Sequence, residues 1–337
     1  MVHFFKKLLV FLSIAFIPLL ILLIGYIYYD PFRVVKEYKN YSYSLPVPHV
    51  IPNRDFINTA IFINNEKKLN YNSFVFGSSR TSAFTAAAWK KHLNENDRIF
   101  FFDASGEAIY GIYTKLKYLD KVNAKIDNAL ILFCRDAVFK YTGNFSNHLS
   151  IKHPAVSGES KLFFHFVFFR AYLNLKFLNS FYNYTFTKSI KPYMNEYINP
   201  AKLSVDSLSN GEDLSPWDSV ISSNPQEYYD KKKNIFYERK GETIDSVKRI
   251  NEISLYMLQE IKRILVKHNT RYKIILSPLY DEMKFSVEDL KILKQIFGNN
   301  LFDFTGENQI TRSKYNWYEA NHFRTFIGDS ILNVIYK

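Results

Sequence analysis

A run of 22 residues without a charged side chain, Leu8–Tyr29, constrains this chain more than any other feature of its sequence. An α-helix rises about 1.5 Å per residue, so the run is long enough to cross the roughly 30 Å hydrocarbon core of a bilayer. We therefore predict that residues 1–29 form a short tip and a transmembrane helix. Basic residues favour the cytoplasmic side of a membrane, so Lys6 and Lys7 predict a cytoplasmic tip with the rest of the chain outside.

A cleaved signal peptide is the alternative interpretation of this segment. The apolar run is longer than the 7–15 residues typical of the core of such a peptide, and no small-x-small cleavage site follows it. Tyr26, Tyr28 and Tyr29 stand there instead, which is typical of the aromatic belt at the outer membrane interface. Basic residues also follow from Arg33 onward, which weakens the orientation signal. We expect an uncleaved anchor with a single membrane pass.

This placement changes what the net charge of +12 implies about partners. The two lysines of the tip account for part of it, and the remaining +10 would face lipid headgroups and acidic surface polymers. We therefore predict a membrane partner and no nucleic-acid partner. The basic residues are dispersed, apart from a cluster at residues 230–240 that is typical of a solvated face.

The sequence carries no motif for a metal or a cofactor. A single cysteine, Cys134, excludes an intramolecular disulfide and a multi-cysteine metal site, and its place inside an apolar run is typical of a packing group. A His-Glu-x-x-His motif, an acidic calcium loop and a glycine-rich nucleotide loop are all missing. We predict that the protein uses neither a metal nor a cofactor.

Five short apolar segments, each bounded by polar or turn residues, are typical of buried parallel strands. They are residues 73–77, 99–103, 129–134, 272–277 and 301–304. Helical periodicity lies between them, most clearly over residues 243–268 and again from Ser286 to Gly298. This alternation predicts an α/β domain with an open parallel sheet over residues 71–337, after a stalk over residues 30–70.

Residues 140–240 interrupt the alternation and are rich in Phe, Tyr and Asn. We predict a largely helical insertion that covers or flanks the face where the strands end. Within it, residues 161–181 predict one amphipathic or largely buried helix. Its length would allow a second membrane span, but charged or titratable side chains within it argue against one. They are Lys161, His165, Arg170 and Lys176. Its Phe-rich face could still dip into a membrane surface.

The first predicted strand runs into the turn Gly77-Ser78-Ser79-Arg80. In an open α/β sheet, ligands bind beyond the carboxyl ends of the strands. Glycine permits a tight turn, and a serine at the start of the following helix is exposed beside backbone N–H groups that can hold an oxyanion. Ser79 is thus a candidate nucleophile. A serine that only caps the helix is the alternative.

A second candidate motif, Glu319-Ala320-Asn321-His322, follows the fifth strand and precedes a last predicted helix over residues 325–336. A neutral histidine can accept the proton of a serine, and a carboxylate three residues away can fix its tautomer. A structural histidine at the start of the last helix is the alternative interpretation.

Together, these motifs resemble the SGNH (GDSL-like) hydrolase superfamily. That family places its nucleophile third in a Gly-x-Ser turn after strand one and carries Asp-x-x-His before the C-terminal helix. Residues 75–81 (VFGSSRT) and 321–332 (NHFRTFIGDSIL) resemble membrane-anchored bacterial proteins of D-alanyl-lipoteichoic acid transfer and alginate O-acetylation. The resemblance covers residues 73–137 and 272–337, and it implies an open three-layer, flavodoxin-like domain.

The resemblance also implies a role for each motif residue. Ser79 would be the nucleophile, His322 the general base and then acid, and Glu319 the residue that orients His322. Backbone N–H groups of Ser79 and Gly106, the glycine after the second strand, would hold the oxyanion.

This chain departs from the family pattern at two positions. Glu319 stands where the family has aspartate, and no asparagine follows the third strand. Arg135 stands there instead, and either donates to the oxyanion or pairs with Asp136. Arg80 either recognises an anionic substrate or anchors its helix, and we favour the anchor.

The resemblance implies acyl-ester chemistry on a glycan of the bacterial cell envelope, with acetyl as the acyl group. A sugar hydroxyl would complete a transfer and water a hydrolysis, and both routes stay open. It places the protein in the cytoplasmic membrane, with a membrane-bound acyltransferase as a possible partner. The alternative is an inactive SGNH-like scaffold or binding subunit of a polysaccharide assembly, which the two departures favour.

Overall fold

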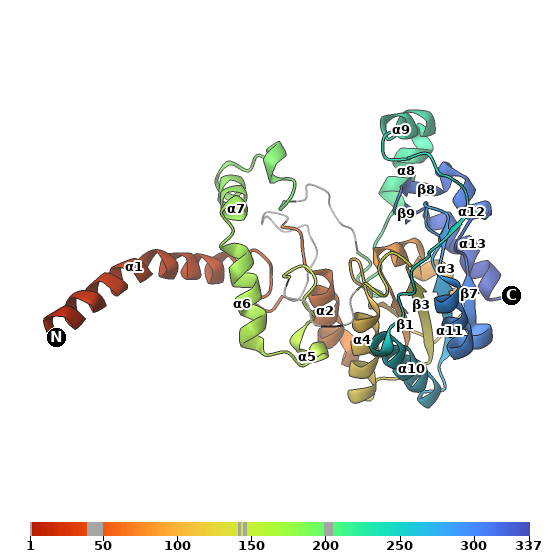
Figure 1. The fold of residues 1–337 in the computed structure, drawn as a ribbon, viewed down its shortest axis with the longest axis horizontal. Coiled ribbons are helices and arrows are strands. Elements are labelled where there is room, and N and C mark those ends of the chain that lie inside the picture. Colours follow the sequence, from red (N-terminus) through yellow and green to blue (C-terminus); the bar gives the residue numbers. More distant parts are fainter. Residues whose placement is uncertain (1, 39–49, 141–142, 144–146, 199–204) are drawn as a thin grey trace.

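The centre of the molecule is a sheet of five parallel strands in the order β2–β1–β3–β5–β7 (Figure 1). The computed structural model describes residues 2–38, 50–140, 143, 147–198 and 205–337. The strands are β1 (Ser73–Phe76), β2 (Ile99–Phe101), β3 (Asn128–Phe133), β5 (Arg271–Leu276) and β7 (Leu301–Asp303). Each overlaps a segment predicted from the sequence, although β3 and β5 begin one residue before the predicted start. The strand order matches the flavodoxin-like one. The prediction of an α/β domain with an open parallel sheet is confirmed.

Helices cover both faces of this sheet and give the domain three layers. Phe74 and Ile131 point to one face, which packs against α2 (Arg54–Leu69), α4 (Ile109–Lys121), α10 (Glu252–Lys267) and α11 (Val287–Phe297). Val75 and Leu132 point to the other face, which packs against α3 (Ala86–Lys90) and α13 (Thr325–Ile335). Since both faces are buried, the strands read as continuous apolar runs rather than alternating ones.

Helix α2 lies inside the segment that the sequence analysis interpreted as a stalk. Asn53 caps its start by accepting a 2.9 Å hydrogen bond from the N–H of Phe56, and Phe62 is fully buried in the core. The pattern missed this helix because its buried face also carries polar residues, Asp55 and Asn58 among them. Their burial depends on partners elsewhere in the chain.

Helix α10 is shorter than the periodicity predicted. It begins at Glu252, because Asn251 and Ser254 form a reciprocal cap there. Residues 243–244 instead form the short strand β4 (Thr243–Ile244), which pairs with β6 (Met283–Lys284). The predicted start at residue 243 is therefore wrong. Helix α11 matches its prediction, with Ser286 as N-cap and Gly298 at φ +56° beyond its last turn.

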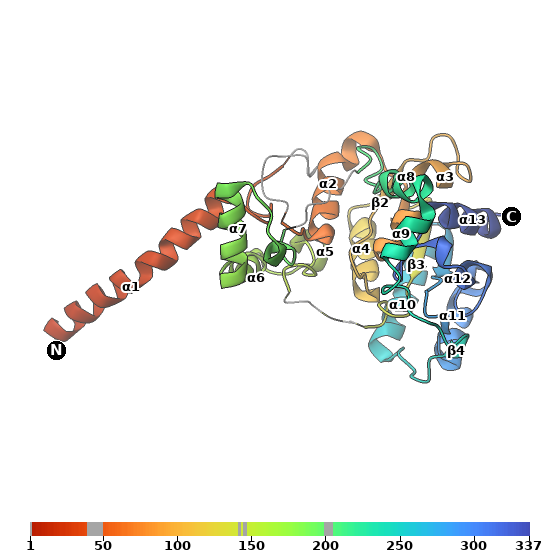
Figure 2. The same ribbon diagram turned by 90° about the horizontal axis from the view of Figure 1, so that it is seen from above.

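Helix α1 (Val2–Tyr29) extends away from the body of the molecule (Figures 1 and 2). Large apolar side chains on it are exposed, among them Phe11, Phe16 and Leu20. Among the described residues, no helix is both long and apolar enough to cross a bilayer.

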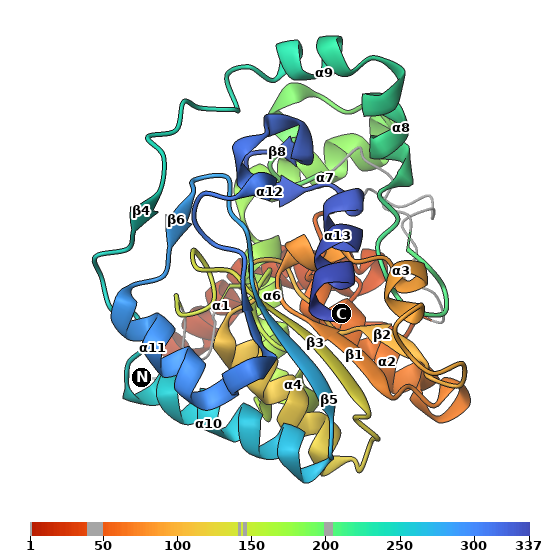
Figure 3. The same cartoon turned by 90° about the vertical axis from the view of Figure 1, so that its right-hand side faces the viewer.

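The insertion divides into two parts that lie far apart. The helices α5 (Pro154–Ser157), α6 (Lys161–Tyr172) and α7 (Leu175–Thr187) lie on the side where α1 joins the body. By contrast, α8 (Ser215–Ser223) and α9 (Pro225–Lys231) lie with the C-terminal elements at the other side (Figures 1 and 3). The single helix predicted over residues 161–181 is wrong, because Asn174 caps a new helix by accepting from two backbone N–H groups.

The last elements of the chain form a small hairpin and a helix. Strands β8 (Trp317–Glu319) and β9 (His322–Phe323) pair antiparallel, and the preceding short helix is α12 (Gln309–Arg312). We call residues 317–323 the β8–β9 hairpin. Helix α13 follows it directly and packs against the turn after β1.

Candidate active site

The turn after β1 presents Ser79 at the carboxyl end of the sheet. Gly77 adopts φ +145°, and a Cβ atom there would lie 2.9 Å from the backbone oxygen of Leu132. Only glycine therefore fits this turn. Ser78, not Ser79, is the N-cap of the short 3-10 helix η1 (Ser79–Ala83) and accepts from the N–H of Arg80. The capping alternative for Ser79 is thus wrong, and its hydroxyl is available for other contacts.

The hydroxyl of Ser79 lies 2.8 Å from Nε2 of His322. Nδ1 of the same ring is hydrogen-bonded to Oε1 of Glu319. The other carboxylate oxygen of Glu319, Oε2, accepts a 2.7 Å hydrogen bond from the N–H of Asn321. Glu319 and His322 face each other as a cross-strand pair in the β8–β9 hairpin. This pairing explains why a glutamate three residues away reaches the imidazole.

The partners of the imidazole select its tautomer. A carboxylate can only accept, so Nδ1 carries the proton and Nε2 is left to accept from the Ser79 hydroxyl. Burial favours the neutral form of Glu319, but its hydrogen bonds to His322 and to the Asn321 N–H, together with the charge of Arg80, lower its pKa below the ordinary value. Glu319 is therefore ionised at neutral pH. The three groups form the hydrogen-bonded chain of a serine–histidine–carboxylate triad.

Arg80 joins the two halves of this arrangement. Its Nε donates a 2.6 Å hydrogen bond to the carbonyl oxygen of Asn321, and its two terminal nitrogens bind Asp136 at 3.0 and 2.9 Å. The guanidinium is buried, with a relative exposure of 8%. These contacts favour the anchoring interpretation of Arg80. They also give Asp136 a different partner from the one the sequence suggested.

Arg135 lies in a separate ion-pair cluster. Its guanidinium binds Asp245 at 3.1 Å and also binds Asp281. It is buried, and among the described residues it forms no hydrogen bond with Ser79 or His322. The pairing with Asp136 that the sequence suggested is wrong, and the ion pairs speak against Arg135 as an oxyanion donor.

The loop that carries Gly106 is tied to the turn of the nucleophile. Asp103 is fully buried and accepts a 2.8 Å hydrogen bond from the hydroxyl of Thr81, and the N–H of Ala104 donates to the carbonyl of Gly77. Gly106 itself is exposed at φ +59°. Within the described part of the chain, no group accepts from the N–H of Ser79 or Gly106. Both donors are free to bind a negatively charged oxygen.

Four buried charged side chains form an ion-pair network next to the loop that carries Gly106. Lys115 and Lys152 each bind both Asp55 and Glu107, with distances of 2.8 and 2.9 Å to Asp55. The relative exposure of all four side chains is 6% or less. Burial would raise the pKa of Asp55, but the charges and hydrogen bonds of the two lysines lower it to about 2. The sequence offers no signal for this network, because its members are far apart along the chain.

Helices α8 and α9 support the β8–β9 hairpin. The hydroxyl of Tyr228 donates to the carbonyl of Tyr318 at 2.8 Å. Asp218 accepts from the hydroxyl of Tyr318, from Nε of Arg324 and from the hydroxyl of Thr325, at 2.8, 3.0 and 2.6 Å. These residues belong to no sequence motif, so their role was not predictable from the sequence. Among the described residues of the insertion, helices α8 and α9 flank the site.

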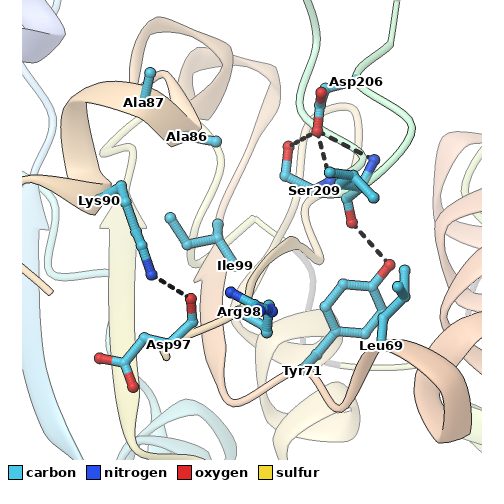
Figure 4. Close-up of a pocket in the computed structure, with 11 residues that line it drawn as sticks. Leu69, Tyr71, Ala86, Ala87, Lys90, Asp97, Arg98, Ile99, Asp206 and Ser209 are labelled. Atoms are coloured by element: carbon cyan, nitrogen blue, oxygen red, sulfur yellow. Dashed lines mark hydrogen bonds between the residues drawn. The ribbon is translucent and has the colours of Figure 1, made fainter. Parts of the chain in front are cut away.

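A cavity of about 560 Å³ beside the edge strand β2 lies apart from this arrangement (Figure 4). Two of its polar side chains are already engaged: the hydroxyl of Tyr71 donates to the carbonyl of Leu208, and the amine of Lys90 donates to the carbonyl of Asp97. None of its lining residues belongs to the Ser79–His322 site. Among the described residues, no cluster of His, Cys, Asp and Glu is arranged to hold a metal ion.

No protein-family model and no curated protein matches this chain. The functional interpretation therefore depends on the geometry of Ser79, His322 and Glu319.

Proposed function

We propose that this protein is a membrane-anchored, extracytoplasmic serine enzyme of the SGNH type that acts on acyl esters. The supporting observation is the hydrogen-bonded chain from Ser79 through His322 to Glu319, which joins residues 243 positions apart at 2.8 Å. A histidine that merely caps α13 would have no reason to meet a serine at the end of β1. Serine, histidine and carboxylate in this order are the components of nucleophilic acyl transfer.

The first half of the reaction forms an acyl-enzyme. The Ser79 oxygen attacks the carbonyl carbon of the ester while its proton moves to Nε2 of His322, and Glu319 stabilises the resulting imidazolium. The N–H groups of Ser79 and Gly106 hold the negative oxygen of the tetrahedral intermediate. This intermediate then breaks its bond to the leaving alcohol, which takes the proton back from His322.

The second half of the reaction releases the acyl group. A hydroxyl of an envelope glycan, or water, gives its proton to His322 and attacks the acyl carbon, and Ser79 leaves with that proton. Transfer of an acetyl group to or from such a glycan is the activity we propose. A membrane-bound acyltransferase partner would supply the acyl group, and α1 would hold the enzyme in the bacterial cytoplasmic membrane beside it.

Labelling with a fluorophosphonate probe tests the proposal, because this reagent reacts preferentially with an activated serine. We expect the full chain in detergent to be labelled and to hydrolyse p-nitrophenyl acetate. Ser79→Ala should lose both properties and keep its thermal unfolding midpoint. Ser330→Ala, which removes an exposed serine hydroxyl on α13, should keep both. Undiminished labelling of Ser79→Ala would exclude Ser79 as the nucleophile.

The alternative is a catalytically inactive subunit of an envelope polysaccharide assembly. The specific observation in its favour is that Arg135, which stands where the resemblance leads one to expect an oxyanion donor, is held by Asp245 and Asp281. One such donor typically contributes about 10²–10³ in rate. A folded wild-type chain that fails to react with the probe would favour this alternative.

A further inference from the structure

Helices α6 and α7 expose large apolar side chains on their outer faces. Leu162, Phe163 and Phe166 on α6, and Leu175 and Phe186 on α7, make up what we call the α6–α7 surface. Leu162 is 84% exposed, Leu175 is 81% exposed and Phe186 is 74% exposed. Several large apolar side chains exposed on two neighbouring helices are typical of an interaction site.

The protein core does not use these exposed side chains, because other residues of the two helices already fill it. The inner faces of the two helices are already filled, because Phe168 of α6 and Phe177 of α7 are buried in an aromatic cluster with Phe32. Helix α6 therefore carries large apolar side chains on both its inner and its outer sides, with the charged Lys161 and Arg170 exposed near its two ends. A helix of this kind is found in the interior of a large protein or in contact with a membrane.

The charge of the segment points to the membrane. Residues 161–191 contain five Lys or Arg residues and no Asp or Glu, whereas the whole chain has 32 acidic residues. Aromatic and aliphatic side chains flanked by cations only are typical of helices that lie in the interface of a bilayer with anionic lipids.

The position of the surface agrees with this charge pattern. Helix α1 leaves the body at α6 and α7 (Figures 1 and 2). The hydroxyls of Tyr172 and Tyr182 are hydrogen-bonded at 2.6 Å, and a Cβ atom on Gly25 of α1 would lie within 2.9 Å of both. Gly25 therefore allows close contact between α1 and the two helices. A bilayer that surrounds α1 would reach the α6–α7 surface.

We infer that the α6–α7 surface rests on the outer leaflet of a membrane that contains anionic lipids. Leu162, Phe166 and Leu175 enter the boundary between headgroups and acyl chains, while the flanking lysines meet the phosphates. The inference rests on the anchoring by α1 that we propose above. Since the β8–β9 hairpin lies on the side of the molecule away from α1 (Figures 1 and 3), the hairpin that carries His322 would lie away from the membrane.

Fluorescence quenching in vesicles tests this inference on the full chain. Variants with one added cysteine, Phe166→Cys and Leu175→Cys, carry an environment-sensitive dye on that residue, and Ile253→Cys, an exposed apolar position on α10, is the matched control. The natural Cys134 is buried and escapes labelling under native conditions. The proteins are reconstituted in vesicles of phosphatidylcholine and phosphatidylglycerol, and flotation of the vesicles reports anchoring separately.

We expect doxyl-labelled lipids to quench the dye at positions 166 and 175 at least threefold more than at position 253, and aqueous iodide to do the reverse. Vesicles of phosphatidylcholine alone should weaken the lipid quenching. If the protein floats with the vesicles but iodide quenches all three dyes equally, the inference is overturned, and the anchoring by α1 is still supported. Dyes at 166 and 175 shielded from both quenchers would indicate a protein partner instead. Failure to float would exclude both the anchor and the membrane contact, whereas the phosphonate label reports catalysis independently.

Discussion

The Nε atom of Arg80 donates a 2.6 Å hydrogen bond to the carbonyl oxygen of Asn321. This contact connects the residue after the candidate nucleophile with the residue before the candidate base, across the boundary between the sheet and the β8–β9 hairpin. The same guanidinium binds Asp136 beyond β3 with two nitrogens. Arg80 therefore sets the distance between Ser79 and His322, although it touches neither reacting atom.

Replacing Arg80 by lysine should slow catalysis without preventing folding. An ammonium group cannot bind Asp136 with two nitrogens and Asn321 with a third, so the hairpin would shift relative to Ser79. A misplacement of about 1 Å lowers rates by about 10²-fold, and we expect kcat to fall by that order with little change in KM. Arg98→Lys, at an exposed position, is the control. An unchanged kcat would show that the hairpin keeps its position without Arg80.

Glu319 should be replaceable by aspartate but not by glutamine. Glutamine can donate to Nδ1 of His322 and so favour the tautomer that cannot accept from Ser79. We expect Glu319→Gln to lower kcat by about 10³–10⁴-fold. Glu319→Asp keeps the negative charge and should retain most of the activity, as measured by steady-state kinetics on p-nitrophenyl acetate. Equal activity of the two variants would mean that the carboxylate does not orient the imidazole.

Gly328 on α13 should tolerate no side chain. A Cβ atom there would lie 2.1 Å from the carbonyl oxygen of Ala83 at the end of η1, and this backbone atom has little freedom to move. We expect Gly328→Ala to lower the free energy of unfolding by roughly 1–3 kcal/mol. It should also lower kcat, because η1 carries Ser79. Gly143→Ala, where a Cβ would meet no atom of the described residues within 4 Å, should leave both the urea midpoint and kcat unchanged.

Asp55 should make stability depend on pH in the acid range. Its pKa in the folded state is about 2, below the ordinary value of 3.8, so the unfolded chain binds the proton first. The stabilisation by Asp55 is therefore complete above about pH 4 and is lost as the pH falls toward 2. The shift corresponds to roughly 2 kcal/mol of unfolding free energy.

Asp55→Asn is the variant that checks this dependence. It leaves the buried ammonium groups of Lys115 and Lys152 with Glu107 as their shared carboxylate, so we expect a loss of roughly 3–5 kcal/mol at neutral pH. Urea unfolding at a series of pH values should also show a flatter acid limb than in the wild type. The exposed Glu288→Gln serves as the control. An acid limb as steep as that of the wild type would assign the effect to other carboxylates.

Strand positions were predictable because both faces of the sheet are buried. Under that condition a strand must be apolar throughout, so the segments at Phe74 and Leu130 stand out from their polar surroundings. The start of a helix was predictable where a local cap marks it, as at Ser286. The predicted start of α10 was wrong because apolar residues before Asn251 happen to continue the helical spacing. Helix α2 could not be found in this way, because Asp55 and Asn58 on its buried face are acceptable only beside their distant partners.

The candidate site shows the same division between local and distant effects. Gly77-Ser78-Ser79 and Glu319-Ala320-Asn321-His322 were recognisable because turn geometry and side-chain chemistry are properties of a few adjacent residues. Other features of the site are properties of the folded chain: Ser78 caps the helix, Arg80 rather than Arg135 binds Asp136, and α8 and α9 contact the hairpin. A charged side chain has many possible partners in a sequence, and the energy of burying it depends on which one lies within reach. Only the packing of segments that are far apart along the chain makes that choice.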